Sequence, residues 1–224
     1  AWVKAVGEMQ RAHMNMARVW AGGVYPPDAF YDACDTAGIL VWQDYMFANM
    51  VPGTSSFMDS VEKEAFEQQE RLERHASFAI WCGNNELNVA WNNWGWQKTY
   101  NLHGSDSLRV DSAYQEMFDE EDGYLSPGVF TNYTPTSPLS NWGIKSGLRY
   151  GDLHYWGVWH GDEAFTSFKK NVGRFVSEYG FQSYPDSALL AKYYDPKELY
   201  LGSPTMKRMQ RSYKPDKPIW DAIK

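Results

Sequence analysis

The sequence predicts an α/β fold on a parallel sheet, and more specifically a (β/α)8 barrel of which this chain carries about six of eight strands. Short apolar runs of strand length alternate with helical patterns or long loops, and hairpin signals between them are weak. Polar or acidic residues directly follow several of these runs, where α/β enzymes carry their functional side chains. An open doubly wound sheet is less favoured, because no glycine-rich phosphate loop follows any run.

The first part of the chain shows the alternation clearly. Apolar residues at helical spacing over 1–13 precede a strand-like run at 15–20. A second helix is expected over 29–36, with Asp28 as its N-cap. The apolar run 39–44 then predicts a second buried strand.

The middle of the chain contains the strongest helix and the strongest strand. Residues 59–75 have one apolar side, and the other side is dense in Glu, Gln and Arg, which is typical of a solvated helix face. Five consecutive apolar residues at 78–82 predict a strand buried on both faces. This run ends at Gly83-Asn84-Asn85-Glu86, so a carboxylate is expected at the rim of the sheet.

The later elements are less regular. An aromatic loop or short turn is expected at 91–96, and a helix at 114–118. Further strands are expected at 129–133, 153–156 and 173–180, and a further helix at 187–194. The last of these strands ends, like the run before Glu86, with a carboxylate, here that of Glu178.

A closed barrel needs eight strands, so two are missing from the pattern. The helical start predicts that the first strand precedes Ala1, and the last strand is expected after Lys224. Residues 1–224 are therefore expected to form one partial catalytic barrel. A first residue other than Met also suggests a piece of a longer protein.

Composition narrows the range of functions. A formal net charge of −7 argues against nucleic acid or an anionic membrane as the main partner. No apolar run approaches the ~20 residues of a membrane-spanning helix. Aromatic residues make up 17% of the chain, which suits both core packing and stacking against sugars. The 2 cysteines do not form a disulfide framework, and the compartment stays open.

Glu86 and Glu178 both end predicted buried strands, so both are expected on the same rim. One carboxyl group that keeps its proton and one that stays ionised can act as general acid and nucleophile. A structural ion pair explains either residue about equally well. No metal or cofactor is expected, because the five histidines lack ligand spacing, and His154 is interpreted as a hydrogen-bonding rim or core residue.

Longer stretches identify the chain more narrowly than any single motif. It resembles the clan-A retaining glycosidases, and within them the beta-mannosidases of glycoside hydrolase family 2. The stretches that carry this resemblance, in family order, are 15–20 (NMARVW), 28–35 (DAFYDACD), 39–44 (ILVWQD), 80–86 (IWCGNNE), 154–161 (HYWGVWHG) and 174–183 (RFVSEYGFQS).

The resemblance implies a role for each matching residue. Glu86 would be the acid/base, and Glu178 the nucleophile that forms a covalent glycosyl-enzyme. Asn85 would bind the sugar near its 2-position, Arg18 would orient the nucleophile, and Tyr155 would donate a hydrogen bond to it.

Three tryptophans, Trp20, Trp156 and Trp159, are candidates for the sugar-binding wall, although a packing role is about as probable at each. The implied reaction removes terminal non-reducing beta-D-mannose from beta-mannosides by double displacement. The implied partner is a beta-mannoside oligosaccharide or a glycan derived from a glycoprotein.

The resemblance also implies further domains and leaves alternative functions open. Family members carry an N-terminal sandwich and an immunoglobulin-like domain before the barrel, and no stretch of this sequence corresponds to them. The rival functions are another family-2 activity, beta-galactosidase or beta-glucuronidase, and a non-catalytic carbohydrate-binding barrel.

Overall fold

The computed structural model describes residues 1–121, 123–127, 132–141 and 145–223. It divides into two compact units. The first unit consists of Ala1–Tyr155 with Lys169–Glu178, and the second of Trp156–Phe168 with Tyr179–Lys224.

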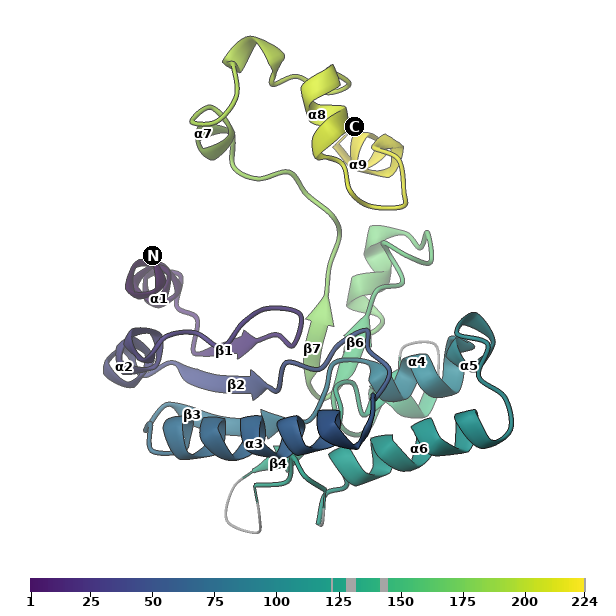
Figure 1. Ribbon diagram of the computed structural model, residues 1–224. Coiled ribbons are helices and arrows are strands. Elements are labelled where there is room, and N and C mark those ends of the chain that lie inside the picture. The colour runs from purple at the N-terminus through teal and green to yellow at the C-terminus, as the bar shows by residue number, and fades with distance from the viewer. Residues whose placement is uncertain (122, 128–131, 142–144, 224) are drawn as a thin grey trace. The chain divides into compact units, whose positions relative to one another are not determined.

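Two parallel-stranded sheets organise the first unit (Figure 1). The larger has four parallel strands in chain order, β1 (Met16–Val19), β2 (Leu40–Asp44), β3 (Phe78–Cys82) and β4 (Tyr133–Thr134). The smaller has three in the order β5 (Ser140–Asn141), β6 (Leu153–Tyr155) and β7 (Val176–Tyr179), of which β5 and β6 pair in parallel.

The predicted α/β class with parallel sheets is confirmed. Both sheets are open within the described residues, so the closed barrel expected from the sequence is not confirmed. The run 78–82 forms β3 with the expected bounds, but the expected burial on both faces is wrong for its first part, since only Trp81 and Cys82 are buried. Of the strand predicted at 129–133, residues 129–131 lie outside the described part, and the described strand there is β4.

Helices alternate with the strands of the larger sheet along the chain, in the manner of a βα repeat. They are α1 (Trp2–Arg11), α2 (Asp28–Ala37), α3 (Ser55–Leu72), α4 (Leu87–Asn93), α5 (Trp96–Thr99) and α6 (Ser105–Phe118), followed by the 3₁₀ turn η1 (Lys145–Leu148). α1 and α2 lie side by side (Figure 1). The aromatic stretch 91–96 contains the end of α4, a break at Trp94 and Gly95 and the start of α5, so it combines short helical turns with a connection. α6 starts well before the predicted helix, and Val110 in its added part is also buried.

The N-cap predicted for α2 is wrong. Pro27 occupies the N-cap position, and Asp28 lies in the first turn of the helix without a side-chain cap. Its carboxylate instead accepts a hydrogen bond from Arg71 Nη1 at 2.9 Å. A carboxylate in the first turn also interacts favourably with the helix dipole. Gly38 ends the helix at φ 68°, a left-handed conformation that favours glycine.

The core of the first unit lies between the larger sheet and α3. Trp81 is fully buried and stacks on Tyr45, with ring centroids 4.3 Å apart and planes at 9°. Its indole nitrogen donates to Glu73 at 3.0 Å, so its one polar atom is satisfied. Val61 and Leu72 on α3 belong to the same buried cluster. This packing fixes β3, and with it the segment that leads to Glu86.

The second unit holds short elements. They are η2 (Phe165–Lys169), whose last residue belongs to the first unit, then α7 (Ser187–Leu190), η3 (Pro196–Glu198), α8 (Pro204–Met209) and α9 (Lys217–Ile223). Phe181 packs against the rings of Trp159 and Phe165, each at a centroid distance of 4.9 Å. The helix predicted at 187–194 is shorter than expected.

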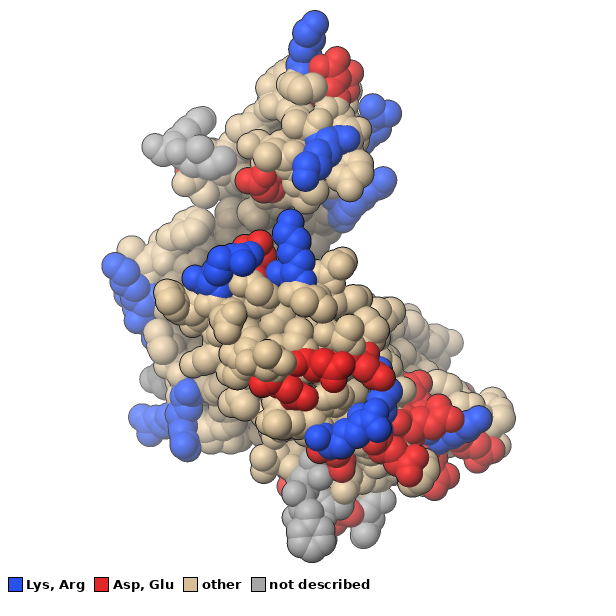
Figure 2. Space-filling model, turned by 90° about the vertical axis from the view of Figure 1, so that its left-hand side faces the viewer, with Lys and Arg blue, Asp and Glu red and all other residues tan. Residues whose placement is uncertain are grey.

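The surface carries both signs of charge. Figure 2 shows acidic and basic side chains interspersed on one face of the molecule. Among the described residues, no helix combines the length and the apolar character required to cross a membrane.

Trp81→Ala is expected to lower the free energy of unfolding by about 3–5 kcal/mol, because it opens a cavity beneath the sheet. Urea unfolding measures this loss. Leu108→Ala on α6, where the side chain is 69% exposed, is the control, with an expected change within about 0.5 kcal/mol. Equal effects of the two substitutions would contradict the described core.

The stability of the fold is also expected to depend on Asp35. Burial tends to raise the pKa of this carboxyl group, but hydrogen bonds from Ser77 and His75 outweigh burial and lower it. A lowered folded-state pKa stabilises the protein above the unfolded value of ~3.9. This contribution is lost as the pH falls through the folded-state pKa.

Asp35→Asn should therefore destabilise the protein clearly at pH 6, and the difference from the native chain should shrink toward about pH 3. Unfolding curves at both pH values test this. A constant difference would mean that the Asp35 charge does not contribute.

Candidate active site

Arg18 is at the centre of a polar cluster at the carboxyl ends of the strands. From β1 its Nη2 donates to Asp44 Oδ2 at 2.8 Å, and its Nε lies 3.3 Å from Asp44 Oδ1. The same guanidinium donates to Glu178 Oε1 and to Asn85 Oδ1, each at 2.9 Å. Residues from four segments of the chain are therefore joined through one cation.

Asp44 ends β2 and is completely buried. It also accepts hydrogen bonds from Trp42 Nε1 at 2.8 Å and from the backbone of Ala21 at 3.1 Å. Burial alone would lower the pKa of Arg18, but the charge of Asp44 and its hydrogen bond raise it above the ordinary value. Arg18 is thus a permanent cation. Burial also raises the pKa of the neighbouring Cys82 thiol.

The two predicted carboxylates meet in this cluster. Glu86 follows β3, and Glu178 lies within β7. One carboxylate oxygen of each lies within 4.8 Å of the other and of a ring nitrogen of His154. Their side chains are partly exposed, at 22% and 19%, so both remain accessible from solvent. Glu86 has φ 62°, which is uncommon for a residue with a long side chain.

His154 connects the two carboxylates. It lies in β6 and is only 1% exposed. Its Nδ1 is 2.7 Å from Glu86 Oε1 and 3.5 Å from Glu178 Oε2. The interpretation of His154 as a hydrogen-bonding residue is confirmed, but its contact with both carboxylates was not foreseen. Its position between apolar neighbours in a strand was the available signal, because a buried histidine needs partners.

Asn85 and Tyr155 are both buried in the first unit. Asn85 contacts Arg18 as described, and Tyr155 is the last residue of β6. Trp20 follows β1 and is 45% exposed, so a ring face is available to solvent.

The other two predicted tryptophans belong to the second unit. Trp156 is half-buried and lies 5.4 Å from the His160 ring, measured between centroids. Trp159 is buried, packs against Phe181 and has the Lys214 ammonium 5.7 Å from its ring centroid. Their role in sugar binding stays a prediction.

Two groups of side chains bring potential metal ligands together. Asp32, Asp35 and His75 form one, and Glu86, His154 and Glu178 form the other. In the second group the Arg18 guanidinium already contacts Glu178 at 2.9 Å, so a cation is in place beside the carboxylates. This arrangement resembles a proton-transfer site more than a metal centre, since a metal ion would face that positive charge.

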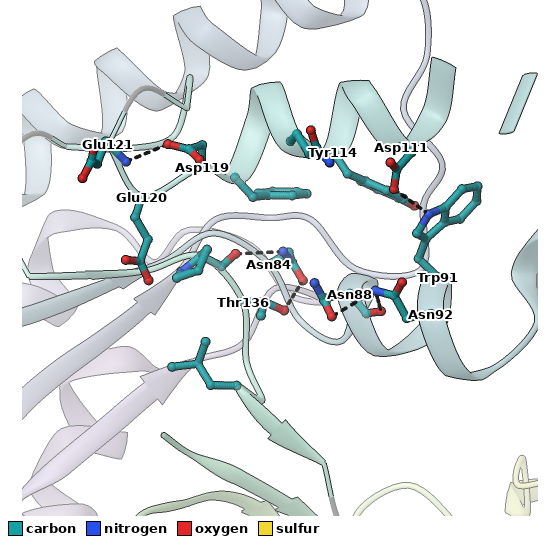
Figure 3. Close-up of a pocket in the computed structure, with 14 residues that line it drawn as sticks. Asn84, Asn88, Trp91, Asn92, Asp111, Tyr114, Asp119, Glu120, Glu121 and Thr136 are labelled. Atoms are coloured by element: carbon teal, nitrogen blue, oxygen red, sulfur yellow. Dashed lines mark hydrogen bonds between the residues drawn. The ribbon is translucent and has the colours of Figure 1, made fainter. Parts of the chain in front are cut away.

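A separate cavity of about 680 Å³ is lined by residues that do not belong to the cluster around Arg18. Trp91 and Asn88 of α4 face Tyr114 and Asp111 of α6 across it, and Trp91 donates to Asp111 at 3.1 Å (Figure 3). The side chain of Asn84 is fixed at its wall by Thr136 and the Pro135 carbonyl. Neither Glu86 nor Glu178 lines this cavity.

Comparisons with known proteins point in one direction. The chain is 40% identical over 190 residues to beta-mannosidase B of Thermothelomyces thermophilus, an alignment that covers 82% of this chain. It is 39% identical over 186 residues to beta-mannosidase B of Aspergillus fumigatus. The chain is related to beta-mannosidases. It spans only 22% of the length of these relatives.

Solved structures also include a beta-mannosidase that resembles this chain. The crystal structure of a beta-D-mannosidase from Dictyoglomus thermophilum matches 97% of this chain and 26% of its own, with a TM-score of 0.72 and 32% identity. A Bacteroides uniformis beta-glucuronidase matches 75% of this chain and 20% of its own, with a TM-score of 0.54. At 18% identity this second match shows similarity of fold alone. No family model matches the chain. The resemblance predicted from the motifs is confirmed by these relatives.

Arg18→Met is expected to lower the free energy of unfolding by about 3–5 kcal/mol, because it leaves the Asp44 carboxylate buried without its cation. Chemical unfolding measures this. The double variant Arg18→Met/Asp44→Asn should be destabilised less than Arg18→Met alone, since the uncompensated charge is then removed. Additive losses would indicate that the two side chains act independently.

Proposed function

We propose that this chain carries the catalytic residues of a retaining glycoside hydrolase that removes terminal non-reducing beta-D-mannose from beta-mannosides. The observation that carries the proposal is the meeting of Glu86 and Glu178 beside Arg18. The similarity to proteins named beta-mannosidase supports mannose as the sugar. On this ground mannose is favoured over galactose or glucuronic acid, and the pair of carboxylates favours an enzyme over a non-catalytic binding barrel.

The two carboxylates have different surroundings, which supports different roles. Glu178 accepts a hydrogen bond from the Arg18 guanidinium, which orients the carboxylate and suits a nucleophile. Glu86 contacts the ring nitrogen of His154, a group that can exchange a proton with it. We therefore assign Glu178 as the nucleophile and Glu86 as the acid/base.

The reaction proceeds in two steps. A Glu178 oxygen forms a bond to the anomeric carbon while the glycosidic C–O bond breaks, and the leaving oxygen takes the proton of Glu86. A water molecule then gives a proton to the Glu86 carboxylate, its oxygen bonds to the anomeric carbon, and the bond to Glu178 breaks. The second step restores both side chains to their starting forms.

The distance between the carboxylates supports retention of configuration. Retaining glycosidases have carboxyl groups ~5–5.5 Å apart, whereas inverting enzymes need ~6.5–9.5 Å to admit a water molecule. One oxygen of Glu86 and one of Glu178 lie within 4.8 Å of each other, and this close approach is the basis on which we propose retention.

The remaining site residues follow from the same assignment. Asn85, fixed by Arg18, would bind the sugar near its 2-position, and Tyr155 would donate to the nucleophile. Trp20, Trp156 and Trp159 would offer ring faces to the sugar.

The parallel strands would be part of a (β/α)8 barrel, with residues 1–224 as its partial catalytic domain. An N-terminal sandwich and an immunoglobulin-like domain would be its partners in the longer protein. The substrate would be a beta-mannoside oligosaccharide or a glycan from a glycoprotein.

The complete natural protein that contains this chain is expected to hydrolyse an aryl beta-mannoside, and Glu178→Ala should reduce kcat by at least about 10⁴-fold. Azide should restore turnover in Glu178→Ala and yield the alpha-mannosyl azide, because azide enters the space left by the carboxylate. The NMR spectrum of the product identifies the anomer.

Glu86→Ala is the matched variant on the other carboxylate, and azide should there yield the beta-mannosyl azide. Release of alpha-mannose as the first product of the native protein would overturn retention. Unchanged turnover in Glu178→Ala would overturn the assignment of the nucleophile.

A further inference from the structure

Behind the two carboxylates lies a buried network of hydroxyl groups and one further carboxylate. Asp152, which precedes β6, accepts a hydrogen bond from Ser137 Oγ at 2.6 Å and a shorter one from Ser177 Oγ. Its other oxygen accepts from the backbone N–H of Leu139 at 2.8 Å. Ser137 and Asp152 are buried, and Ser137 Oγ is also 2.9 Å from His154 Nε2. None of these residues has a role in the reaction described above.

The contacts point to one arrangement of the protons. The hydroxyls of Ser137 and Ser177 both donate to Asp152 Oδ2. Ser137 has then used its one proton and must accept from His154, which places a proton on Nε2. Arg18 Nη1 lies farther from Nε2, at 3.4 Å, so Ser137 is the closer partner. The hydrogen bond to Ser137 therefore selects the tautomer of His154.

With Nε2 protonated, His154 Nδ1 and Glu86 Oε1 face each other at 2.7 Å. At this distance one proton must lie between them, because two lone pairs would repel. We propose that Glu86 and His154 share a single proton, and that His154 is a positioning residue that holds this proton at the acid/base for transfer to the leaving oxygen. The proposal rests on the proposed function and adds a residue to it.

The proton balance follows the two reaction steps. Before the reaction the pair holds one shared proton, and departure of the leaving group removes it. The pair is then a Glu86 carboxylate and a neutral imidazole that keeps its Nε2 proton on Ser137. The incoming water returns one proton to the pair, so no proton is gained or lost over a cycle.

Charged groups flank the pair on both sides. Glu178 Oε2 lies 3.5 Å from His154 Nδ1, and Arg18 Nη1 lies 3.4 Å from Nε2, so a negative and a positive group both face the ring. The titratable or charged groups that face the pair, directly or through Arg18, are Arg18, Asp44, Cys82, Asp152 and Glu178.

The test is His154→Asn in the complete natural protein. The introduced amide donates to the Glu86 carboxylate and cannot accept its proton, so the ionised form is favoured. The basic limb of the kcat/KM profile should move toward acid by about one pH unit. Turnover of a phenyl beta-mannoside, whose leaving group needs a proton, should fall about 10²-fold, and that of a 2,4-dinitrophenyl beta-mannoside far less.

Two further variants keep the test decisive. Ser137→Ala removes the acceptor of the Nε2 proton and should shift the basic limb in the same direction by a smaller amount. It carries the test alone if His154→Asn does not fold. His103→Asn makes the same substitution at an exposed position in the segment before α6, and should leave both substrates and the profile unchanged.

The outcomes separate the two proposals. Loss of activity on both substrates to the same extent, with an unmoved basic limb, would overturn the shared proton and leave the mannosidase assignment intact. No hydrolysis of either beta-mannoside by the native protein would instead overturn the proposed function.

Discussion

The polar interior of the first unit depends on the ion pair between Arg18 and the buried Asp44. A buried carboxylate without a partner costs several kcal/mol, so Arg18 must stay beside it. The remaining donors of the guanidinium are then directed at Asn85 and Glu178. One electrostatic requirement of β1 and β2 thereby sets the positions of groups contributed by β3 and β7. The partly exposed Glu178 carboxylate is held by a cation whose pairing with Asp44 is itself shielded from water.

Much of this arrangement could be predicted from the sequence, because local rules apply to it. The apolar run 78–82 has the length and composition of a strand, so its strand has the predicted bounds. Glu86 and Glu178 were identified because parallel strands bring their carboxyl ends to one edge. Arg18 was reached only through the resemblance to known glycosidases, and its contact with Glu178 agrees with that inference.

Other features depend on tertiary contacts that no local pattern encodes. The sequence predicts Asp28 as a helix cap, but its carboxylate instead accepts a hydrogen bond from Arg71, 43 residues away. The sequence predicts His154 as a hydrogen-bonding residue but does not give its partners, because Ser137 and Asp152 lie in irregular segments without a periodic signal. Sheet closure is likewise a property of the whole chain and not of any one strand.

The left-handed backbone of Glu86 has a consequence for engineering. Only glycine adopts such a conformation without strain, and other residues bear a cost of order 1 kcal/mol or more. Glycine at this position would relieve the strain but would remove the carboxylate. A selection for thermal resistance alone would therefore enrich variants that lack this carboxylate, so stabilised forms of this protein should be sought with position 86 held constant.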